Sequence, residues 1–367
     1  MSQNPSTPLE YAEAAVDTMR RRFPVARDLP PTQHFHYHQG VFLSGVYQTY
    51  LLNRNEEYLQ YVKDWVDSNI GPRGEVLNHD QICLDDIQPG ILLFPLLELT
   101  DDPRYRNALD QLAGELRFFP KNDEGGFWHK QRVAGQMWLD GLYMGGPFMT
   151  GYGTRFNDPD LVNNAIGQAL LMQEKTRVPE VGLWRHAYDP SHKADWADPE
   201  TGLSPEFWGR SVGWVPVAIL DELDAIDRDH PARPALVDLV RNLLTAVCNY
   251  QGPDGRWWQV LDKVGQKGNW PENSCTCLFV TALARAVRTR ILDKTYLEAA
   301  RKGYQGVIRS LTWKGDDLEV GQVCIGTGVG DYRHYCERPT STNDLHGVGA
   351  FLLMCTRMQQ VLPVTGQ

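Results

Sequence analysis

Two aspartates lie in apolar runs of the sequence, where a charged side chain is costly. Asp140 is in QMWLDGLYM and Asp85 is in CLDDIQPG. Such a carboxyl group is either a helix cap or a functional acid, because burial without a partner is unfavourable. Apolar walls raise the pKa of a carboxyl group. We therefore expect Asp140, flanked by Trp138 and Leu139, to hold a proton and Asp85 to be ionised, as an acid/base pair would require.

Aromatic and basic residues occur at comparable places along the chain. They precede or begin segments of helical periodicity, or lie in the long segments between them: His36, His38, Trp138, Trp208, Arg210 and His346 in the first group, and Trp128, His129, Lys130 and His186 in the second. Indole rings cover the apolar face of a sugar ring while polar groups bind its hydroxyls. This composition favours a carbohydrate pocket, although each tryptophan taken alone is more often a core residue.

Arg210 follows Ser204-Pro205-Glu206, which has the residue types of a helix N-terminus. We expect that helix to begin near residue 206 and to direct the guanidinium group into the pocket. A structural ion pair is the alternative role. With Lys130, His129 and His186 nearby, a cationic pocket in an otherwise acidic protein predicts an acidic ligand.

The elements that must position these residues are helices. Apolar residues recur at helical spacing, and we expect twelve helices over 9–22, 39–53, 57–69, 86–99, 103–116, 136–153, 158–174, 206–226, 232–249, 273–289, 295–309 and 343–360. Connections after the even-numbered helices are short and polar, and those after the odd-numbered ones are long. Loops of that length are usually functional.

The pattern predicts an all-α fold, an (α/α)6 barrel of six helical hairpins in one catalytic domain over residues 1–367. Gly-x-Trp-like phrases repeat at residues 126–128, 182–184 and 255–257, which indicates repeated supersecondary units. An open helical solenoid is the alternative. In a barrel, neighbouring inner helices pack about 8–10 Å apart, so Asp85 and Asp140 would approach within roughly 5–9 Å, the range found in glycosidases.

Composition excludes several classes of function. The chain has 367 residues, 42% of them hydrophobic and 22% charged, and a net charge of −10. That charge disfavours binding to nucleic acid. No apolar run is long enough to span a membrane, and the N-terminal segment lacks the pattern of a secretory signal. With seven scattered cysteines, we expect a cytoplasmic protein, monomeric or weakly self-associating.

Metal and cofactor motifs are weak or missing. His34-x-His36-x-His38 could contribute to a zinc site, but no carboxylate or cysteine at metal-ligand spacing completes it. Cys275-x-Cys277 is too closely spaced for a redox pair. The sequence contains no phosphate-binding loop, dinucleotide fingerprint or serine nucleophile motif. We expect neither a metal nor an organic cofactor.

Several motifs together resemble glycoside hydrolase family 105, the unsaturated rhamnogalacturonyl hydrolases. They are EGGFWHK (124–130), QMWLDGLYM (136–144), HAYD (186–189), DPETGLSPEFWGRSVGW (198–214) and NDLHGVGAF (343–351). The resemblance extends over nearly the whole chain, and it implies the (α/α)6 barrel that the helix pattern predicts independently.

The resemblance also implies roles for individual residues. Asp140 matches the general acid/base of the family, and Asp85 matches a second essential carboxylate that contacts sugar hydroxyls. Tyr37 or His38 matches a pocket tyrosine near the N-terminus. The other pocket positions it implies are His129, Trp138, His186, Trp208, Arg210 and Trp214. From their places in the sequence we also expect Lys130 and His346 to bind substrate.

The implied substrate is an oligosaccharide with a Δ4,5-unsaturated uronic acid at its non-reducing end. Asp140 would protonate C4 of the double bond and activate the water that adds at C5, after which the hemiketal opens and the remaining sugar leaves.

Three alternatives remain at this point. One is an unsaturated glucuronyl hydrolase acting on ulvan or glycosaminoglycan fragments. The second is a sugar 2-epimerase, which uses the same barrel but needs paired histidines as acid and base. The third is an inactive carbohydrate-binding protein, against which the presence of both Asp85 and Asp140 argues.

Overall fold

The computed structural model describes residues 5–362, and these form the predicted barrel of six helical hairpins. The inner helices are α2 (Tyr37–Asn53), α4 (Leu93–Thr100), α6 (Asp140–Phe156), α8 (Gly209–Ala225), α10 (Asn273–Arg288) and α13 (Leu345–Val361). The outer helices are α1 (Pro8–Arg22), α3 (Glu56–Asn69), α5 (Pro103–Arg117), α7 (Pro159–Thr176), α9 (Arg233–Cys248) and α11 (Leu297–Ser310).

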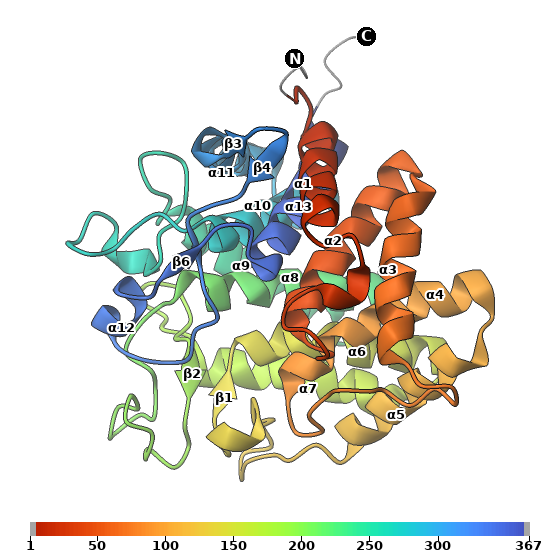
Figure 1. Ribbon diagram of the computed structural model, residues 1–367. Helices are drawn as coiled ribbons and strands as arrows, with labels where there is room; N and C mark the ends of the chain where they lie inside the picture. The colour runs from red at the N-terminus through yellow and green to blue at the C-terminus, as the bar shows by residue number, and fades with distance from the viewer. Residues whose placement is uncertain (1–4, 363–367) are drawn as a thin grey trace.

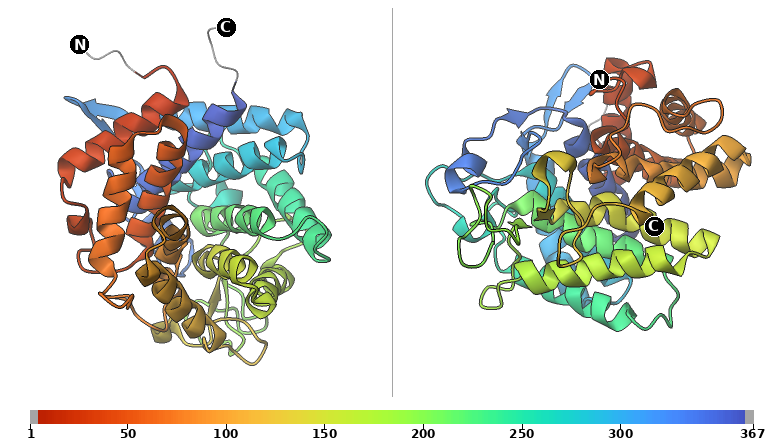
Figure 2. Two further views of the ribbon diagram at one scale, coloured as in Figure 1. Left: turned by 90° about the vertical axis from the view of Figure 1, so that its right-hand side faces the viewer. Right: turned by 90° about the horizontal axis from the view of Figure 1, so that it is seen from below.

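The inner helices close into a ring. The helices α6, α8, α10, α13 and α2 pack on one another in that order, and the 3-10 helix η3 (Gln88–Leu92), which leads into α4, packs on both α2 and α6 and completes the ring. In the left view of Figure 2 the colours follow this order around the ring, so that blue lies beside red. Closure of the ring excludes the open solenoid.

Small residues let the inner helices approach closely. A Cβ atom on Gly349 of α13 would lie 2.6 Å from the backbone of Val41 and Phe42 in α2, and one on Gly213 of α8 would lie 3.0 Å from Leu278 in α10. Side chains at such positions would force the helices apart, because interiors are already close-packed.

The short turns occupy one rim of the barrel. An inner helix ends in a residue with left-handed backbone, and the next residue is the N-cap of the outer helix, so the chain reverses within two residues. The pairs are Arg54 and Asn55, Asp101 and Asp102, and Asn157 and Asp158.

The long loops gather at the opposite rim and contain small elements. Three two-stranded sheets pair β1 (Met137–Trp138) with β2 (Ala187–Tyr188), β3 (Thr312–Lys314) with β4 (Asp317–Glu319), and β5 (Val323–Cys324) with β6 (Thr340–Ser341). The loops also carry α12 (Tyr332–Cys336) and the 3-10 turns η1 (Ala26–Asp28), η2 (Leu84–Asp86), η4 (Gln131–Val133) and η5 (Leu261–Lys263), whereas η6 (Lys294–Tyr296) lies in the connection from α10 to α11 at the other rim. β1, β2, β6 and α12 lie on the same side of the molecule in Figure 1.

Three predicted helix boundaries are wrong at this rim. The helix expected over 86–99 is split into η2, η3 and α4, because Pro89 lacks the N–H that a continuous helix needs there. The helix expected from 136 begins at Asp140, since Met137 and Trp138 pair with β2. The helix expected from 206 begins at Gly209, where Trp208 is the N-cap. Among the described residues, no helix is long and apolar enough to cross a membrane.

Candidate active site

A cavity of about 350 Å³ opens among the long loops at the N-terminal ends of the inner helices. Most of the predicted site residues line it, and they come from segments far apart in the sequence: Tyr37, His38, Asp85, His129, Lys130, Trp138, Asp140, Trp208 and Arg210. Tyr37 and His38 both take part, although the sequence expectation placed only one of them there. The barrel thus brings the two aspartates to one cavity.

Asp140 is the first residue of α6 and is only 9% exposed. Its Oδ2 lies 2.9 Å from Nε2 of His186. Burial raises the pKa of Asp140, but His186, His129 and Arg210 together lower it by more than burial raises it, so the pKa lies below the usual 3.8. The prediction that apolar walls keep this carboxyl group protonated is wrong for the free protein, because charged and hydrogen-bonding neighbours outweigh the walls.

A chain of buried hydrogen bonds leads away from Asp140. His186 is fully buried, and its Nδ1 lies 2.7 Å from the hydroxyl of Tyr335 in α12, which also accepts a hydrogen bond from the Gly330 N–H at 3.2 Å. The arrangement that satisfies every group has Tyr335 donating to Nδ1 and the Nε2–H of His186 donating to ionised Asp140. Burial lowers the pKa of His186, which keeps this ring neutral.

Asp85 contacts a lysine and a histidine. Its Oδ2 lies 2.7 Å from Nζ of Lys130, and its Oδ1 lies 3.3 Å from Nε2 of His129. Burial raises the pKa of Asp85, but His129, Lys130 and His36 lower it, leaving it well below its usual value. This agrees with the expectation that Asp85 is the ionised member of the pair.

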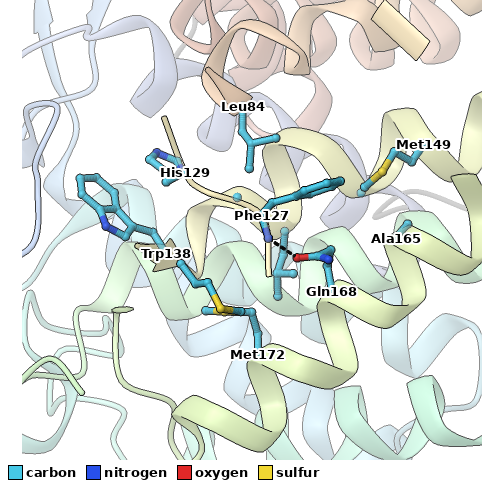
Figure 3. Close-up of a pocket in the computed structure, with 12 residues that line it drawn as sticks. Leu84, Phe127, His129, Trp138, Met149, Ala165, Gln168 and Met172 are labelled. Atoms are coloured by element: carbon cyan, nitrogen blue, oxygen red, sulfur yellow. Dashed lines mark hydrogen bonds between the residues drawn. The ribbon is translucent and has the colours of Figure 1, made fainter. Parts of the chain in front are cut away.

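Aromatic rings form the walls of the cavity. His129 and Trp138 stack with centroids 4.5 Å apart, and Trp208 stacks on Tyr335 at 5.7 Å. Figure 3 shows His129 and Trp138 next to each other, with Phe127 and Gln168 farther along the same pocket; the Phe127 N–H donates to the Gln168 side chain at 2.8 Å. The rings of Trp138 and Trp208 are of the type that covers the apolar face of a sugar ring.

Arg210 is in the first turn of α8 and is 2% exposed. Its Nη1 donates to the carbonyl of Cys324 at 2.6 Å and its Nη2 to that of Ile325 at 2.8 Å, and its guanidinium lies 4.5 Å from the Trp208 ring centroid. Within residues 5–362 it forms no ion pair. The structural ion pair considered from the sequence is therefore not formed, and the positive charge is available to a ligand.

The model of Glycosyl Hydrolase Family 88 matches residues 11–362. The chain belongs to this family. A solved glycoside hydrolase of family 105 from C. acetobutylicum ATCC 824 superimposes with a TM-score of 0.91 at 29% identity, covering 96% of this chain and 99% of that one. The resemblance to family 105 expected from the motifs is therefore confirmed in the fold.

Two curated relatives agree with this assignment. Protein Atu3128 of Agrobacterium fabrum is 32% identical over 225 residues, covering 57% of this chain and 96% of the relative. The unsaturated rhamnogalacturonyl hydrolase YesR of Bacillus subtilis is 26% identical over 296 residues, covering 79% of each. The protein is accordingly a glycoside hydrolase of the family 88 and 105 group.

In this family 88 hydrolase, three predicted site residues lie outside the cavity lining. His186 does not line the cavity but contacts Asp140, which does. Trp214, one turn deeper in α8, is 1% exposed and stacks on Tyr143 at 4.5 Å. His346 is fully buried, and its Nε2 contacts the Cys324 carbonyl at 3.1 Å. Trp214 and His346 therefore pack in the barrel and against the neighbouring loop, and the expectation that they contact ligand stays a prediction.

Sequence reasoning missed a group of lining residues. Met144 belongs to the motif at 136–144 and Arg132 lies between that motif and the one at 124–130, whereas residues 326–328 and Arg338 come from the loop between β5 and β6. The same loop carries Tyr335, which contacts His186. The signal available was the length of the connection after the eleventh helix. Nothing local in that connection indicates that it folds over Asp140.

Histidines continue along one side of the family 88 site. His34 lies 2.9 Å from Asp86, and His36 and His38 lie 2.9 Å apart through their Nδ1 atoms. Burial lowers the pKa of His36 to about 4. The fold also brings carboxylates to these rings: His38, Asp344 and His346 form one group with potential metal-ligand atoms within 4.8 Å, and His34, Asp80 and Asp86 form another. The absence of metal stays a prediction.

Proposed function

We propose that this protein is an unsaturated rhamnogalacturonyl hydrolase. It would release the terminal Δ4,5-unsaturated galacturonic acid from oligosaccharides left by a rhamnogalacturonan lyase. The observation that supports this most directly is a buried acid, Asp140, in the same aromatic-walled cavity as Arg210, a buried cation without an acidic partner among residues 5–362. An acid/base group in the same cavity as an arginine that can bind a carboxylate suits a uronic acid as the substrate. The similarity to YesR favours a rhamnogalacturonan-derived substrate.

The proposed reaction adds water across the C4=C5 double bond. Arg210 binds the uronate carboxylate, and Asp140 transfers its proton to C4 while the water oxygen bonds to C5. Asp140 then takes a proton from that water, so that it ends the cycle as it began. The product is a hemiketal, which opens and releases the leaving sugar. Asp85, fixed by Lys130, accepts hydrogen bonds from ring hydroxyls.

Asp140 must acquire a proton before this step, since it is ionised in the free protein. A bound uronate carboxylate supplies the reason. It places a second negative charge near Asp140 and neutralises Arg210, one of the groups that lowers the pKa of Asp140. Substrate binding would therefore raise the proton affinity of the acid that the substrate needs.

The test is the substitution Asp140→Asn. We expect the wild-type protein to remove the ultraviolet absorbance of an unsaturated galacturonyl–rhamnose disaccharide. We expect the variant to lose activity by at least about 10³-fold while it still melts cooperatively and binds the disaccharide, because the amide keeps the shape but cannot donate the proton. Full activity in the variant would refute the assignment.

The choice of substrate has its own controls. Loss of absorbance only with glucosamine or sulfated rhamnose as the leaving sugar would favour the unsaturated glucuronyl hydrolase instead. No loss with any unsaturated disaccharide would favour an epimerase or a binding protein. We also propose that residues 1–367 act as one catalytic domain, cytoplasmic and monomeric or weakly self-associating, without a cofactor; cell fractionation and sedimentation test these points.

A further inference from the structure

A second cavity adjoins the one that contains Asp140. It measures about 550 Å³, and four residues line both cavities: His36, Asp85, Lys130 and Arg132. The two spaces therefore share a wall on the side of Asp85. An oligosaccharide whose terminal ring occupies the first cavity has room for further sugars in the second.

Positive charge at the first cavity exceeds what one carboxylate can balance. Three arginines line it, and within residues 5–362 none of them pairs with a carboxylate. Arg210 and Arg338 are anchored on carbonyl or hydroxyl oxygens of the loop at residues 324–327. Arg132 makes no hydrogen bond or ion pair with any described residue. Lys130, in contrast, is paired with Asp85.

The positions of Arg210 and Arg132 indicate different roles for the two residues. Arg210 is buried beside Asp140, where the proposed function places the uronate carboxylate. Arg132 is exposed on η4 and lines both cavities, at the point where the leaving part of the substrate would pass from one to the other. Asp80 lines only the second cavity and lies close to His34 and Asp86.

We propose that Arg132 binds an anionic group carried by the leaving part of the oligosaccharide, which makes the second cavity an anion-selective subsite. This rests on the proposed function, since it assumes that the unsaturated uronate occupies the first cavity. Two sources supply such an anion: the carboxylate of the next uronic acid in an alternating uronate–rhamnose chain, or a sulfate on the leaving rhamnose. The guanidinium group suits either, because it can donate two parallel hydrogen bonds to a carboxylate or sulfate.

The experiment compares three substrates with the wild-type protein, the variant Arg132→Gln and the control Arg333→Gln. The substrates are the unsaturated uronyl–rhamnose disaccharide, the corresponding tetrasaccharide with a second uronate, and the disaccharide with 3-sulfated rhamnose. Arg333 is exposed on α12, pairs with Glu337 and lines neither cavity, so its variant loses the same charge elsewhere. Initial rates give kcat/KM at low and high salt.

We expect one of the two substrates with an anionic leaving part to exceed the unsulfated disaccharide, whose leaving rhamnose is uncharged, in kcat/KM by about threefold to tenfold, the range for one charge-assisted contact at a partly solvated site. Arg132→Gln should lower kcat/KM on that substrate by about threefold to tenfold more than on the unsulfated disaccharide, and salt should reduce the difference between the two substrates in the wild type. The better substrate, tetrasaccharide or sulfated disaccharide, identifies the source of the anion.

Equal kcat/KM for all three substrates in the wild type, or an equal loss on all three in Arg132→Gln, would overturn the proposal. Failure of the proposed function gives a different result. If only the sulfated disaccharide reacts, the rhamnogalacturonyl assignment fails while the anion subsite stands. If none reacts, dissociation constants of the same three oligosaccharides with wild type and Arg132→Gln decide the subsite by the same comparison.

Discussion

The substitution Tyr335→Phe tests whether α12 sets the protonation of Asp140 through His186. It removes one buried hydroxyl and leaves a phenyl ring that can still stack on Trp208. The hydroxyl lies 2.7 Å from Nδ1 of His186, whose Nε2 lies 2.9 Å from Asp140. With Tyr335 donating to Nδ1, the imidazole hydrogen must sit on Nε2, where it stabilises the carboxylate form of Asp140.

Removal of that hydroxyl makes the other imidazole tautomer available. In that form Nε2 accepts a hydrogen bond from protonated Asp140, so the pKa of Asp140 should rise. A hydrogen bond to a charged group contributes about 1.5–3 kcal/mol, and one pKa unit corresponds to about 1.4 kcal/mol, so we expect a rise of about 1–2 units. The buried Nδ1 and the Gly330 N–H lose a partner, which should lower the free energy of unfolding by about 1–3 kcal/mol.

The assay is kcat/KM as a function of pH, which reports the free enzyme. Because Asp140 acts in its protonated form, the pH above which kcat/KM declines should move upward in Tyr335→Phe. The matched control is Tyr332→Phe in the same short helix, whose hydroxyl donates to the Lys267 carbonyl at 3.1 Å and does not contact His186. A loss of stability in Tyr335→Phe with an unchanged pH profile would refute the positioning role and leave a purely structural one.

Two further predictions concern the barrel interior. Glu222 is fully buried, and neither of its carboxylate oxygens has a hydrogen-bond partner in the part of the chain that the structure describes; burial, together with Asp221, raises its pKa to about 8. Because the folded protein favours the protonated form of Glu222, the stability from this group is complete below about pH 4.5 and is lost as pH rises through 8. In urea unfolding, the free energy of unfolding of the wild type should fall by about 3–5 kcal/mol relative to that of Glu222→Gln between pH 4.5 and 9. The same pH dependence of stability in both proteins would contradict this. Gly349→Ala places a Cβ 2.6 Å from backbone atoms of α2 and should cost about 1–3 kcal/mol or more. On outer helix α5, a Cβ at Gly114 would meet no described atom within 4 Å outside its own turn of helix, so Gly114→Ala should instead raise the free energy of unfolding by about 0.5–1 kcal/mol. Equal effects of the two substitutions would show that the close approach of inner helices does not limit the barrel.

The helices and the two unequal rims could be predicted because their signals are local. Each outer helix carries an apolar stripe of helical period, and the short turns carry cap residues such as Asn55 and Asp158. The broken helix around Pro89 could be anticipated only in part, since a proline near a helix start is also compatible with continuation. The polar residues at the starts of the predicted helices were enough to predict that Asp85, Asp140 and Arg210 line one cavity.

The protonation of Asp140 could not be predicted in this way. Its sequence neighbours Trp138 and Leu139 are apolar, but the groups that lower its pKa are His186, His129 and Arg210, which are 46, 11 and 70 residues away. The contact of Tyr335 with His186, which spans 149 residues, could not be predicted either. The sequence also does not show that Trp214, one turn below Arg210, stacks on Tyr143 inside the barrel.

The different partners of the two carboxyl groups explain which of them can change its charge during a reaction. Asp85 is paired with the ammonium group of Lys130, so a bound anion leaves its main partner in place. Asp140 is held by a neutral imidazole and by the field of Arg210, and the substrate carboxylate would bind to that same arginine. A unit negative charge about 5 Å from Asp140, at an effective dielectric constant near 20, adds about 3 kcal/mol, or about two pKa units. A rise of this size opposes the lowering of the pKa by His186, His129 and Arg210 and favours the protonated form that a general acid needs. A neutral sugar would leave Asp140 ionised and inactive, so the requirement for a uronate would be built into the proton transfer as well as into binding.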